Sequence, residues 1–556
     1  MPNFSEGRNL EVINQITREV EKVAGVTLLD VDPGMATNRT VVTFVGEPEA
    51  VVEAAFQAIK MAASLIDMRM HKGEHPRMGA TDVCPLIPVS GVTMEETAEW
   101  AVKLAEKVGN LLNIPVYLYE HAQKDKKRSN LSVIRAGEYE GFKEKIAQVE
   151  WKPDFGPAVW NEKSGATVIG ARDFLIAYNI NLNTKSVRLA NSIAFDVREA
   201  GRVKRIGHPV LGEVALDEQG EPIRVPGKLV ECKAIGWYIE EYGIAQISMN
   251  LTNYKITSMH VAFDAVCESA QQRGIRVTGS ELVGMIPLEA MLQAGKYFLE
   301  KQGRSLGVDD AELIHIAVKS LGLDALAPFS PEEKIIEYKL SKGDKYKLLI
   351  NKSIQDFAFE TASESPAPGG GSIAAYCGVL GAALGTMVAN LSASKRGWEE
   401  KLAFHSSQAE KGQWFLSKLL RAVDEDTYSF NQIMEAFALP KNSEEEKVKR
   451  IEAIENATRY ACEVPFSVMQ TSLDSLDLIE AMVENGNPNS ITDAGVGALC
   501  IRTAIQGAFL NVKINASSLK DKDFAKDLVE KGNLIMAEAT YRVNQIIQNV
   551  EQQIGS

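Results

Sequence analysis

The sequence is poor in cysteine, and its few cysteines show no pattern. Six occur in 556 residues, and no two form C-x-x-C, a spacing common in zinc sites and redox motifs. This scarcity excludes a fold held by disulfides, and we expect small buried apolar side chains at these positions. No secretory signal peptide opens the chain, so the sequence predicts a cytoplasmic protein. The cysteines are Cys84, Cys232, Cys267, Cys377, Cys462 and Cys500.

The sequence has fewer basic than acidic residues. Lysine and arginine number 60 against 74 aspartates and glutamates, which gives a formal net charge of −14. Non-specific nucleic-acid binding depends on clustered basic side chains that neutralise phosphates, so this balance disfavours a nucleic-acid partner. An anionic substrate would be repelled at long range and would need a local basic pocket. Candidates for that pocket are Arg8, Arg39 and Arg77.

Long apolar runs are also lacking, with one exception at residues 371–391. This run is long enough to span a membrane, but Ser372 and Tyr376 interrupt it and no basic segment precedes it. Its glycines equally suit a helix packed tightly against its neighbours, so the sequence predicts no membrane partner. These glycines are Gly378, Gly381 and Gly385.

The chain divides into two regions of different sequence pattern. Up to about residue 340, β-branched runs alternate with amphipathic segments, which is typical of sheets layered with helices. Beyond about residue 352 that alternation is almost lost, and long helical segments follow one another. The predicted fold is α+β, with two sheet-and-helix subdomains, followed by an all-α helical bundle.

Breaker residues and polar stretches suggest the domain boundaries. We expect a first subdomain at residues 1–174, a second at 175–340, a linker at 341–349 and a helical domain at 350–556. Residues 201–227 are polar and rich in glycine and proline, which predicts a surface excursion. In the first subdomain, the pattern predicts strands at 26–32, 40–45, 83–89 and 116–119 and helices at 48–67 and 95–112.

Residues 71–83 (HKGEHPRMGATDV) concentrate titratable side chains between glycines. His71, Glu74 and His75 fit the H-x-x-E-H pattern of one class of zinc peptidase, which needs both imidazoles on one helical face. A glycine and a proline within the motif break such a helix, which favours a loop histidine that transfers protons. A capping loop with incidental histidines is the third interpretation.

Four short motifs carry a family resemblance. Residues 2–8 (PNFSEGR), 37–40 (TNRT) and 73–79 (GEHPRMG) resemble glutamate formimidoyltransferase. Residues 365–372 (SPAPGGGS) resemble the signature of formimidoyltetrahydrofolate cyclodeaminase. The motifs occur in the expected order, and the resemblance to bifunctional formimidoyltransferase-cyclodeaminases covers nearly the whole chain.

This resemblance implies two folate reactions of histidine degradation. The first 340 or so residues would move a formimidoyl group from N-formimidoyl-L-glutamate to N5 of tetrahydrofolate. The helical domain would then form 5,10-methenyltetrahydrofolate and expel ammonia. By motif position His75 is the residue that transfers protons in the first reaction, with Asp32 as a candidate orienting carboxylate and Arg39 as a candidate charge partner.

The resemblance also locates the cyclodeaminase aspartate within residues 423–426 (VDED). Successive helical residues are rotated by about 100°, so Asp424 and Asp426 point roughly 200° apart and only one can face a pocket. Asp426 is the predicted catalytic residue, and Asp424 is the reserve.

The resemblance also implies folate contacts, which we expect in two glycine-containing segments. Glycine lets the backbone approach a flat ligand closely, and free N–H groups at a helix start can hold a polar ligand edge. The residues are Gly156, Pro157, Ser164 and Gly165 in the first segment, and Gly369, Gly370, Gly371 and Ser372 in the second.

The expected partners are small molecules: formimidoylglutamate and tetrahydrofolate, the latter as a polyglutamylated substrate. We expect no metal, and the family resemblance implies a homo-oligomer. Three alternatives come from other classes. They are a transferase that uses a formyl donor, a zinc hydrolase built on residues 71–75, and a non-catalytic folate-binding protein.

Overall fold

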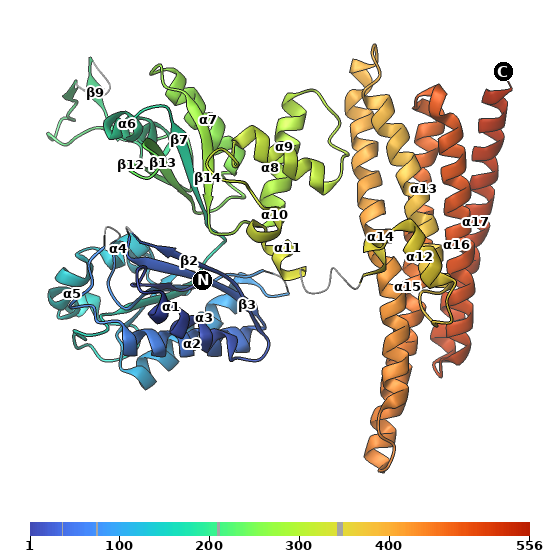
Figure 1. The fold of residues 1–556 in the computed structure, drawn as a ribbon, viewed down its shortest axis with the longest axis horizontal. Helices are drawn as coiled ribbons and strands as arrows, with labels where there is room; N and C mark the ends of the chain where they lie inside the picture. Colours follow the sequence, from blue (N-terminus) through green and yellow to red (C-terminus); the bar gives the residue numbers. More distant parts are fainter. Residues whose placement is uncertain (36, 74–75, 90, 208–211, 342–347, 556) are drawn as a thin grey trace. The chain divides into compact units, whose positions relative to one another are not determined.

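The computed structural model describes residues 1–35, 37–73, 76–89, 91–207, 212–341 and 348–555 (Figure 1). The chain forms two compact units, one made of Met1–Met291 with Val318–Ser341, the other of Leu292–Ala317 with Lys342–Ser556. Two helix-covered sheets are followed by a helical bundle. The predicted α+β fold followed by an all-α region is therefore confirmed.

The first sheet has six strands in the order β2-β3-β1-β4-β6-β5. Pairing is antiparallel among β2, β3, β1 and β4, and parallel from β4 through β6 to β5. The strands are β1 (Asn3–Phe4), β2 (Val26–Gly34), β3 (Arg39–Gly46), β4 (Thr81–Leu86), β5 (Val116–Glu120) and β6 (Thr167–Ala171).

Helices cover the two faces of this sheet unequally. Val42 and Phe44 of β3 are buried in one cluster with Ile59 and Leu104, because alternate strand residues point to the same face. That face is covered by α1 (Leu10–Glu21), α2 (Pro48–Leu65) and α3 (Met94–Leu112). On the other face, Tyr117 packs against side chains of two shorter helices, α4 (Leu131–Arg135) and α5 (Glu138–Ile146).

The second sheet has four antiparallel strands in the order β12-β13-β7-β14. They are β7 (Ile176–Leu182), β12 (Cys232–Ile239), β13 (Ile244–Leu251) and β14 (Val277–Val283), with α6 (Val187–Val197) and α7 (Met259–Gln271) packed against them. Residues 201–227 form two small ribbons in which most described residues are exposed, in agreement with a surface excursion. The ribbon strands are β8 (Arg202–Val203), β9 (Arg205–Ile206), β10 (Glu213–Val214) and β11 (Arg224–Val225).

Four helices lie between β14 and residue 342 along the chain. They are α8 (Leu288–Lys301), α9 (Asp310–Leu321), α10 (Pro331–Lys334) and α11 (Ile336–Ser341). Most of the predicted linker, residues 342–347, lies outside the described residues. Leu349, which the prediction placed in the linker, begins the 3-10 turn η3 (Leu349–Asn351) and is buried in the core of the bundle.

Helix α13 (Gly370–Ala393) packs closely against other helices of the bundle, as the sequence predicted. A side chain at Gly378 would meet Ser472 and Leu419, and one at Gly381 would meet Ile501. Among the described residues, two segments could span a membrane by length and composition, Gly370–Ala393 and Pro488–Ser518, with 61% and 50% of their most apolar windows buried in the protein. The helices are α12 (Ile354–Thr361), α13 (Gly370–Ala393), α14 (Leu402–Ala438), α15 (Glu444–Asn485), α16 (Ile491–Ser518) and α17 (Lys522–Ile554).

Candidate active sites

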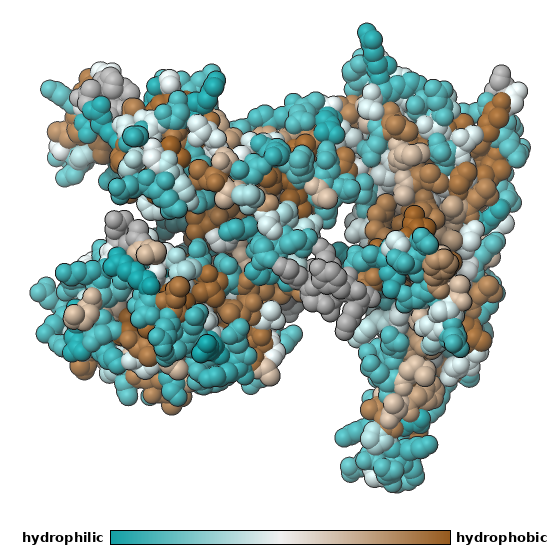
Figure 2. Space-filling model, viewed as in Figure 1, coloured by the Kyte–Doolittle hydropathy of each residue, from teal (hydrophilic) through white to brown (hydrophobic). Residues whose placement is uncertain are grey.

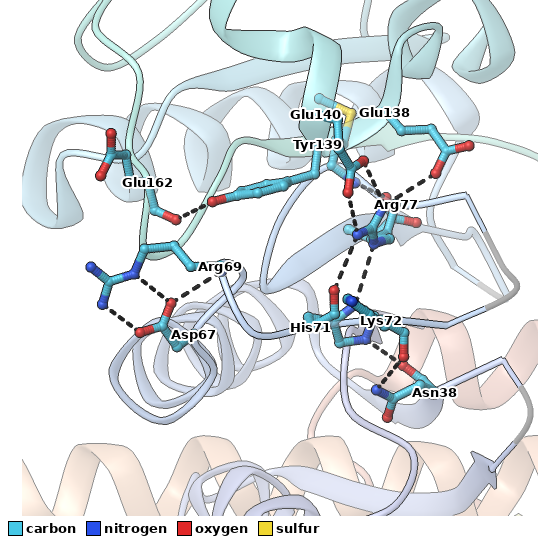
Figure 3. Close-up of polar contacts among 12 residues, drawn as sticks. Asn38, Asp67, Arg69, His71, Lys72, Arg77, Glu138, Tyr139, Glu140 and Glu162 are labelled. Atoms are coloured by element: carbon cyan, nitrogen blue, oxygen red, sulfur yellow. Dashed lines mark hydrogen bonds and ion pairs between the residues drawn. The ribbon is translucent and has the colours of Figure 1, made fainter.

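His71 lies in the loop after α2, at the start of the 71–83 motif, and both of its ring nitrogens have hydrogen-bond partners (Figure 3). His71 Nε2 lies 2.8 Å from the backbone oxygen of Asn38, and Arg77 Nε donates to His71 Nδ1 at 3.3 Å. A carbonyl oxygen only accepts, so Nε2 carries the proton and Nδ1 supplies its lone pair. Burial lowers the pKa of His71. These two hydrogen bonds therefore fit a neutral imidazole whose ring nitrogens both have partners.

These hydrogen bonds weaken the zinc interpretation. A zinc-bound imidazole gives a nitrogen lone pair to the metal, and Arg77 occupies the one lone pair that neutral His71 has. Glu74 and His75 lie outside the described residues. Within the described ranges, no three metal-ligating side chains cluster. The hydrogen bonds of His71 favour the loop interpretation.

Arg77 ties this loop to α5. Its two terminal nitrogens donate to the two carboxylate oxygens of Glu140 at 2.8 and 2.7 Å, and one of them also reaches Glu138 at 3.3 Å. Such bidentate pairs are strong and geometrically specific. Arg77 was a candidate for an anion-binding pocket, but its guanidinium is committed to Glu140 instead (Figure 3).

Asp32 and Arg39 lie on the same face of the first sheet. In the antiparallel β2–β3 pair, Asp32 stands opposite Val41 and Gly34 stands opposite Arg39. Cross-strand partners share a face and side chains alternate, so both residues point away from α1, α2 and α3. Burial, and then the nearby charge of Asp30, raise the pKa of Asp32. A carboxyl with a raised pKa on this face is suited to proton transfer or to orienting a base.

Arg39 bonds two residues, Asn3 and Asp82, that lie in the quoted motifs but were not named as candidate site residues. Its Nε and Nη2 donate to Asn3 Oδ1 at 3.0 and 2.5 Å, and its Nη1 donates to Asp82 Oδ2 at 2.6 Å. Asp82 also accepts from Arg135 Nη2 at 2.7 Å and from the Met78 backbone at 3.1 Å. Asp82 therefore links both arginines to the loop that carries the motif.

A sequence signal for Asp82 was present. It lies in β4, whose residues are all buried, and a buried carboxylate has to be paired. Its partners were not readable from the sequence, because Arg39 and Arg135 are 43 and 53 residues away along the chain.

Two of the expected folate contacts lie beside the motif loop. Gly165 adopts φ +67°, which favours glycine, and a side chain there would collide with the Met78 backbone oxygen. The backbone oxygen of Ser164 accepts from the Ala80 N–H at 2.8 Å. Ser164 and Gly165 are thus backbone neighbours of residues 78–80.

The other two, Gly156 and Pro157, lie elsewhere. Gly156 has φ +79° and packs against Gly109 of α3 and the Ile114 backbone oxygen. Pro157 follows it and is half-buried. The structure therefore separates the four residues into two places, and their folate-binding role stays a prediction.

At the start of α13, the Asp426 carboxylate lies against the helix N-terminus. Ser372 Oγ donates to Asp426 Oδ2 at 2.9 Å, and the Ser372 backbone N–H bonds the same carboxylate. These donors favour the anion, but burial is the larger effect and raises the pKa of Asp426. An aspartate with a raised pKa can take up and return a proton closer to neutral pH than an ordinary one.

The glycines before Ser372 have different roles. A Cβ at Gly371 would fall well inside van der Waals contact with Asp426 Oδ1, so glycine is required for the close approach. A Cβ at Gly370 would meet only the Asn511 side chain, at 3.6 Å. Gly369 is the N-cap residue of α13. Of the four expected contacts, Gly371 and Ser372 therefore lie against Asp426.

Asp424 faces a different neighbour, as the helical rotation predicted. Its Oδ1 accepts from the backbone N–H of Leu349 at 2.6 Å and so holds the start of η3 against α14. Burial raises the pKa of Asp424 as well. The hydrogen bond to Leu349 gives Asp424 a structural function, which supports Asp426 as the catalytic residue.

The sequence analysis did not name two asparagines of α16 that lie near the start of α13 or bond α15. Asn511 lies next to Gly370, and Asn515 Nδ2 donates to the Ala461 backbone oxygen at 2.7 Å. Pro465, four residues later in α15, has no N–H to offer that oxygen, so Asn515 compensates for the missing helical bond. The available signals were two asparagines one turn apart in α16 and a proline inside α15.

Comparison with known proteins agrees with this arrangement of two sites. Three family models match in succession. They are "Formiminotransferase domain, N-terminal subdomain" at residues 1–172, "Formiminotransferase domain" at 177–341 and "Formiminotransferase-cyclodeaminase" at 353–533.

Curated relatives match the whole chain or one part of it. The formimidoyltransferase-cyclodeaminase of Sus scrofa is 40% identical over 559 residues, covering 99% of this chain and 98% of the relative. A glutamate formimidoyltransferase of Streptococcus pyogenes is 38% identical and covers 54% of this chain and 92% of its own length. A methenyltetrahydrofolate cyclohydrolase of Methylorubrum extorquens is 35% identical and covers 37% of this chain and 99% of its own length. The match along nearly the full length of a bifunctional relative establishes that the chain belongs to the formimidoyltransferase-cyclodeaminase family.

Proposed function

We propose that this protein catalyses two consecutive reactions of tetrahydrofolate. The formimidoyl group of N-formimidoyl-L-glutamate moves to N5 of tetrahydrofolate and glutamate leaves. N10 then attacks the same carbon, the ring closes to 5,10-methenyltetrahydrofolate and ammonia leaves. The observation that carries the proposal is the 40% identity to a bifunctional relative over 98% of its length.

The transfer step requires proton movements at two nitrogens. N5 loses its proton as it attacks the amidine carbon, and the departing glutamate nitrogen must gain one. A single histidine with a pKa near about 6.5 can serve both needs in turn. We assign this task to His75, with Asp32 as the carboxyl that orients the base. Arg39, held by Asn3 and Asp82, supplies positive charge on the same sheet face.

Ring closure places a similar demand on the helical unit. N10 must lose a proton while the amidine nitrogen gains protons to leave as ammonia. Asp426 is the proposed proton carrier, because burial raises its pKa and the Ser372 hydroxyl fixes its orientation. Gly371 and Ser372 would then lie beside the folate at the start of α13.

One incubation tests the proposal against its alternatives. With tetrahydrofolate and N-formimidoylglutamate, we expect methenyl absorbance and free ammonia to rise together. Folate binding without ammonia would indicate a binding protein, and activity with formyl donors alone would indicate a formyl transferase. Loss of activity on chelation would indicate the zinc hydrolase.

We further propose that these reactions serve histidine degradation in the cytoplasm, as the family resemblance implies. We also propose that the folate is polyglutamylated, so that its carboxylate tail stays bound while the pterin moves between sites. A polyglutamate that passes to product with no less free intermediate than the monoglutamate would contradict the second statement.

A homo-oligomer is also proposed. Apolar side chains are exposed along α13 and α16, and Figure 2 shows apolar patches in brown on the helical unit. Exposed apolar side chains that recur along helices favour contact with another protein surface, here a second copy. The side chains are Leu380, Met387, Leu391, Val496, Leu499, Leu510 and Ile514. Light scattering that returns the mass of a single chain would contradict the proposal.

Gly371→Ala should stop cyclodeamination while Gly370→Ala is tolerated. Alanine favours helix at both positions, but only at 371 does the new Cβ displace the Asp426 carboxylate. A displacement of about 1 Å at a catalytic group lowers the rate roughly 100-fold. Ammonia release from supplied 5-formimidoyltetrahydrofolate measures the effect. Equal activity in the two variants would show that Asp426 need not lie against α13.

Ser372→Ala should move the acidic limb of the cyclodeaminase pH profile to higher pH. A general base works above its pKa and fails as pH falls through it. The Ser372 hydroxyl donates to the carboxylate and holds the pKa of Asp426 below the value that burial alone would set. Removing this bond should raise the limb by about one pH unit.

The control for this shift is Ser365→Ala. The Ser365 hydroxyl bonds the Ala367 backbone oxygen in the same loop, so its loss should not move the limb. An unchanged limb in Ser372→Ala would show that Asp426 is not the titrating base.

A further inference from the structure

Asp82 shares one carboxylate oxygen between two guanidinium groups. Arg39 and Arg135 both donate to Asp82 Oδ2, at 2.6 and 2.7 Å. Asp82 is fully buried, and each arginine side chain is only 13% exposed. A buried cation is stable only when an anion compensates it. A single shared oxygen compensates Arg135 only in part.

Arg135 also has unused hydrogen-bonding capacity. Its Nη2 bonds Asp82, whereas its Nε is buried and has no hydrogen-bond partner in the part of the chain that the structure describes. A guanidinium presents five N–H donors in a rigid fork that matches a carboxylate. Arg128 is a useful contrast. Its Nε also has no partner among the described residues, but it pairs at 3.1 Å with Asp154, to which no second described arginine or lysine is paired. Incomplete countercharge together with a free donor distinguishes Arg135.

The position of Arg135 relates it to the first reaction. Asp82 Oδ1 accepts from the Met78 N–H at 3.1 Å, and Met78 is three residues after His75. Arg135 is therefore held on the carboxylate that also bonds Arg39 and the Met78 N–H of the motif.

The chemistry of the two substrates selects the anion. In N-formimidoylglutamate, three bonds separate the transferred carbon from the α-carboxylate. In tetrahydrofolate, the whole p-aminobenzoyl group lies between N5 and the tail carboxylates. A cation that serves the reacting centre therefore matches the α-carboxylate of the amino-acid donor rather than the folate tail.

We propose that Arg135 binds the α-carboxylate of the formimidoyl donor, and that Asp82 is a positioning residue that holds the guanidinium in place. This inference rests on the proposed transferase function. It assigns Arg135 to substrate specificity, because a donor without that carboxylate would leave the guanidinium unpaired.

Steady-state kinetics of Arg135→Gln and Arg135→Lys test the assignment, with Arg128→Gln as the matched buried-arginine control. We expect the KM for the donor to rise roughly 10- to 100-fold in Arg135→Gln, as for loss of a charged hydrogen bond. The KM for tetrahydrofolate and the cyclodeaminase activity should not change. Arg135→Lys should recover part of the donor affinity, since it keeps the charge but loses the fork.

A donor analogue isolates the carboxylate. N-formimidoyl-4-aminobutyrate lacks only the α-carboxylate, so the wild type should discriminate strongly against it and Arg135→Gln should not. Unchanged discrimination in Arg135→Gln would overturn the proposal. A rise in the KM for tetrahydrofolate instead of the donor would also overturn it and would indicate the folate tail. Equal kinetic loss in Arg128→Gln would show a structural role only.

Calorimetry separates this inference from the proposed function. L-Glutamate, the product of transfer, should bind the full chain without folate, and Arg135→Gln should abolish that binding. If the wild type binds glutamate through Arg135 but transfers no formimidoyl group, the proposed function fails and the site stands. Binding that Arg135→Gln leaves intact overturns the site, whatever the activity.

Discussion

Asp426→Asn should stop ammonia release and leave formimidoyl transfer intact. Asparagine has the same shape and can still accept from Ser372 Oγ, so the start of α13 should keep its structure. It cannot take up a proton, and removal of a general acid–base group lowers the rate roughly 100- to 10,000-fold. Supplied with both substrates, the variant should accumulate 5-formimidoyltetrahydrofolate, which chromatography of the folates detects.

Asp424→Asn is the matched control for this change. Asp424 Oδ1 accepts from the Leu349 N–H, so its neutralisation should weaken the contact between η3 and α14 without removing a proton carrier. We expect a lower unfolding temperature and near wild-type ammonia release from the folded protein. Full loss of ammonia release here, with activity kept in Asp426→Asn, would reverse the assignment.

His75→Ala should have the opposite effect, abolishing transfer while cyclodeamination of supplied 5-formimidoyltetrahydrofolate continues. The expected loss is again roughly 100- to 10,000-fold. His75 lies outside the described residues, and its assignment comes from the family motif. The structure supports it indirectly, because both nitrogens of His71 in the same loop already have partners. Glutamate release measures the transfer.

Two controls accompany this variant. His121 is exposed on the same unit, and His121→Ala should leave transfer unchanged. Mixing His75→Ala with Asp426→Asn should restore methenyl formation, since each protein supplies the site that the other lacks. Near wild-type transfer by His75→Ala alone would refute the assignment of the base. No recovery on mixing would indicate a folding defect.

Strongly periodic segments were predictable from the sequence. The strand predicted at 40–45 is β3 (Arg39–Gly46), and the helix predicted at 95–112 is α3 (Met94–Leu112). Thr93 and Glu96 form a capping box that begins this helix, so its start was encoded locally. By contrast, β1 (Asn3–Phe4) is too short to show any period, and only its pairing with β3 and β4 makes it a strand.

The sequence by itself determined the strongly periodic strands and helices, the change from sheets to a bundle and the motifs that identify the family, because each of these depends on local periodicity or local spacing. It also determined that Asp424 and Asp426 point apart, since helical rotation is local. Only the tertiary structure decided what each one meets: Leu349 for Asp424, and Ser372, 54 residues away, for Asp426. The same holds for Asp82, whose two arginines come from distant elements. Burial forces a charged side chain to find a partner, but packing between elements decides which one, and no local pattern records that choice.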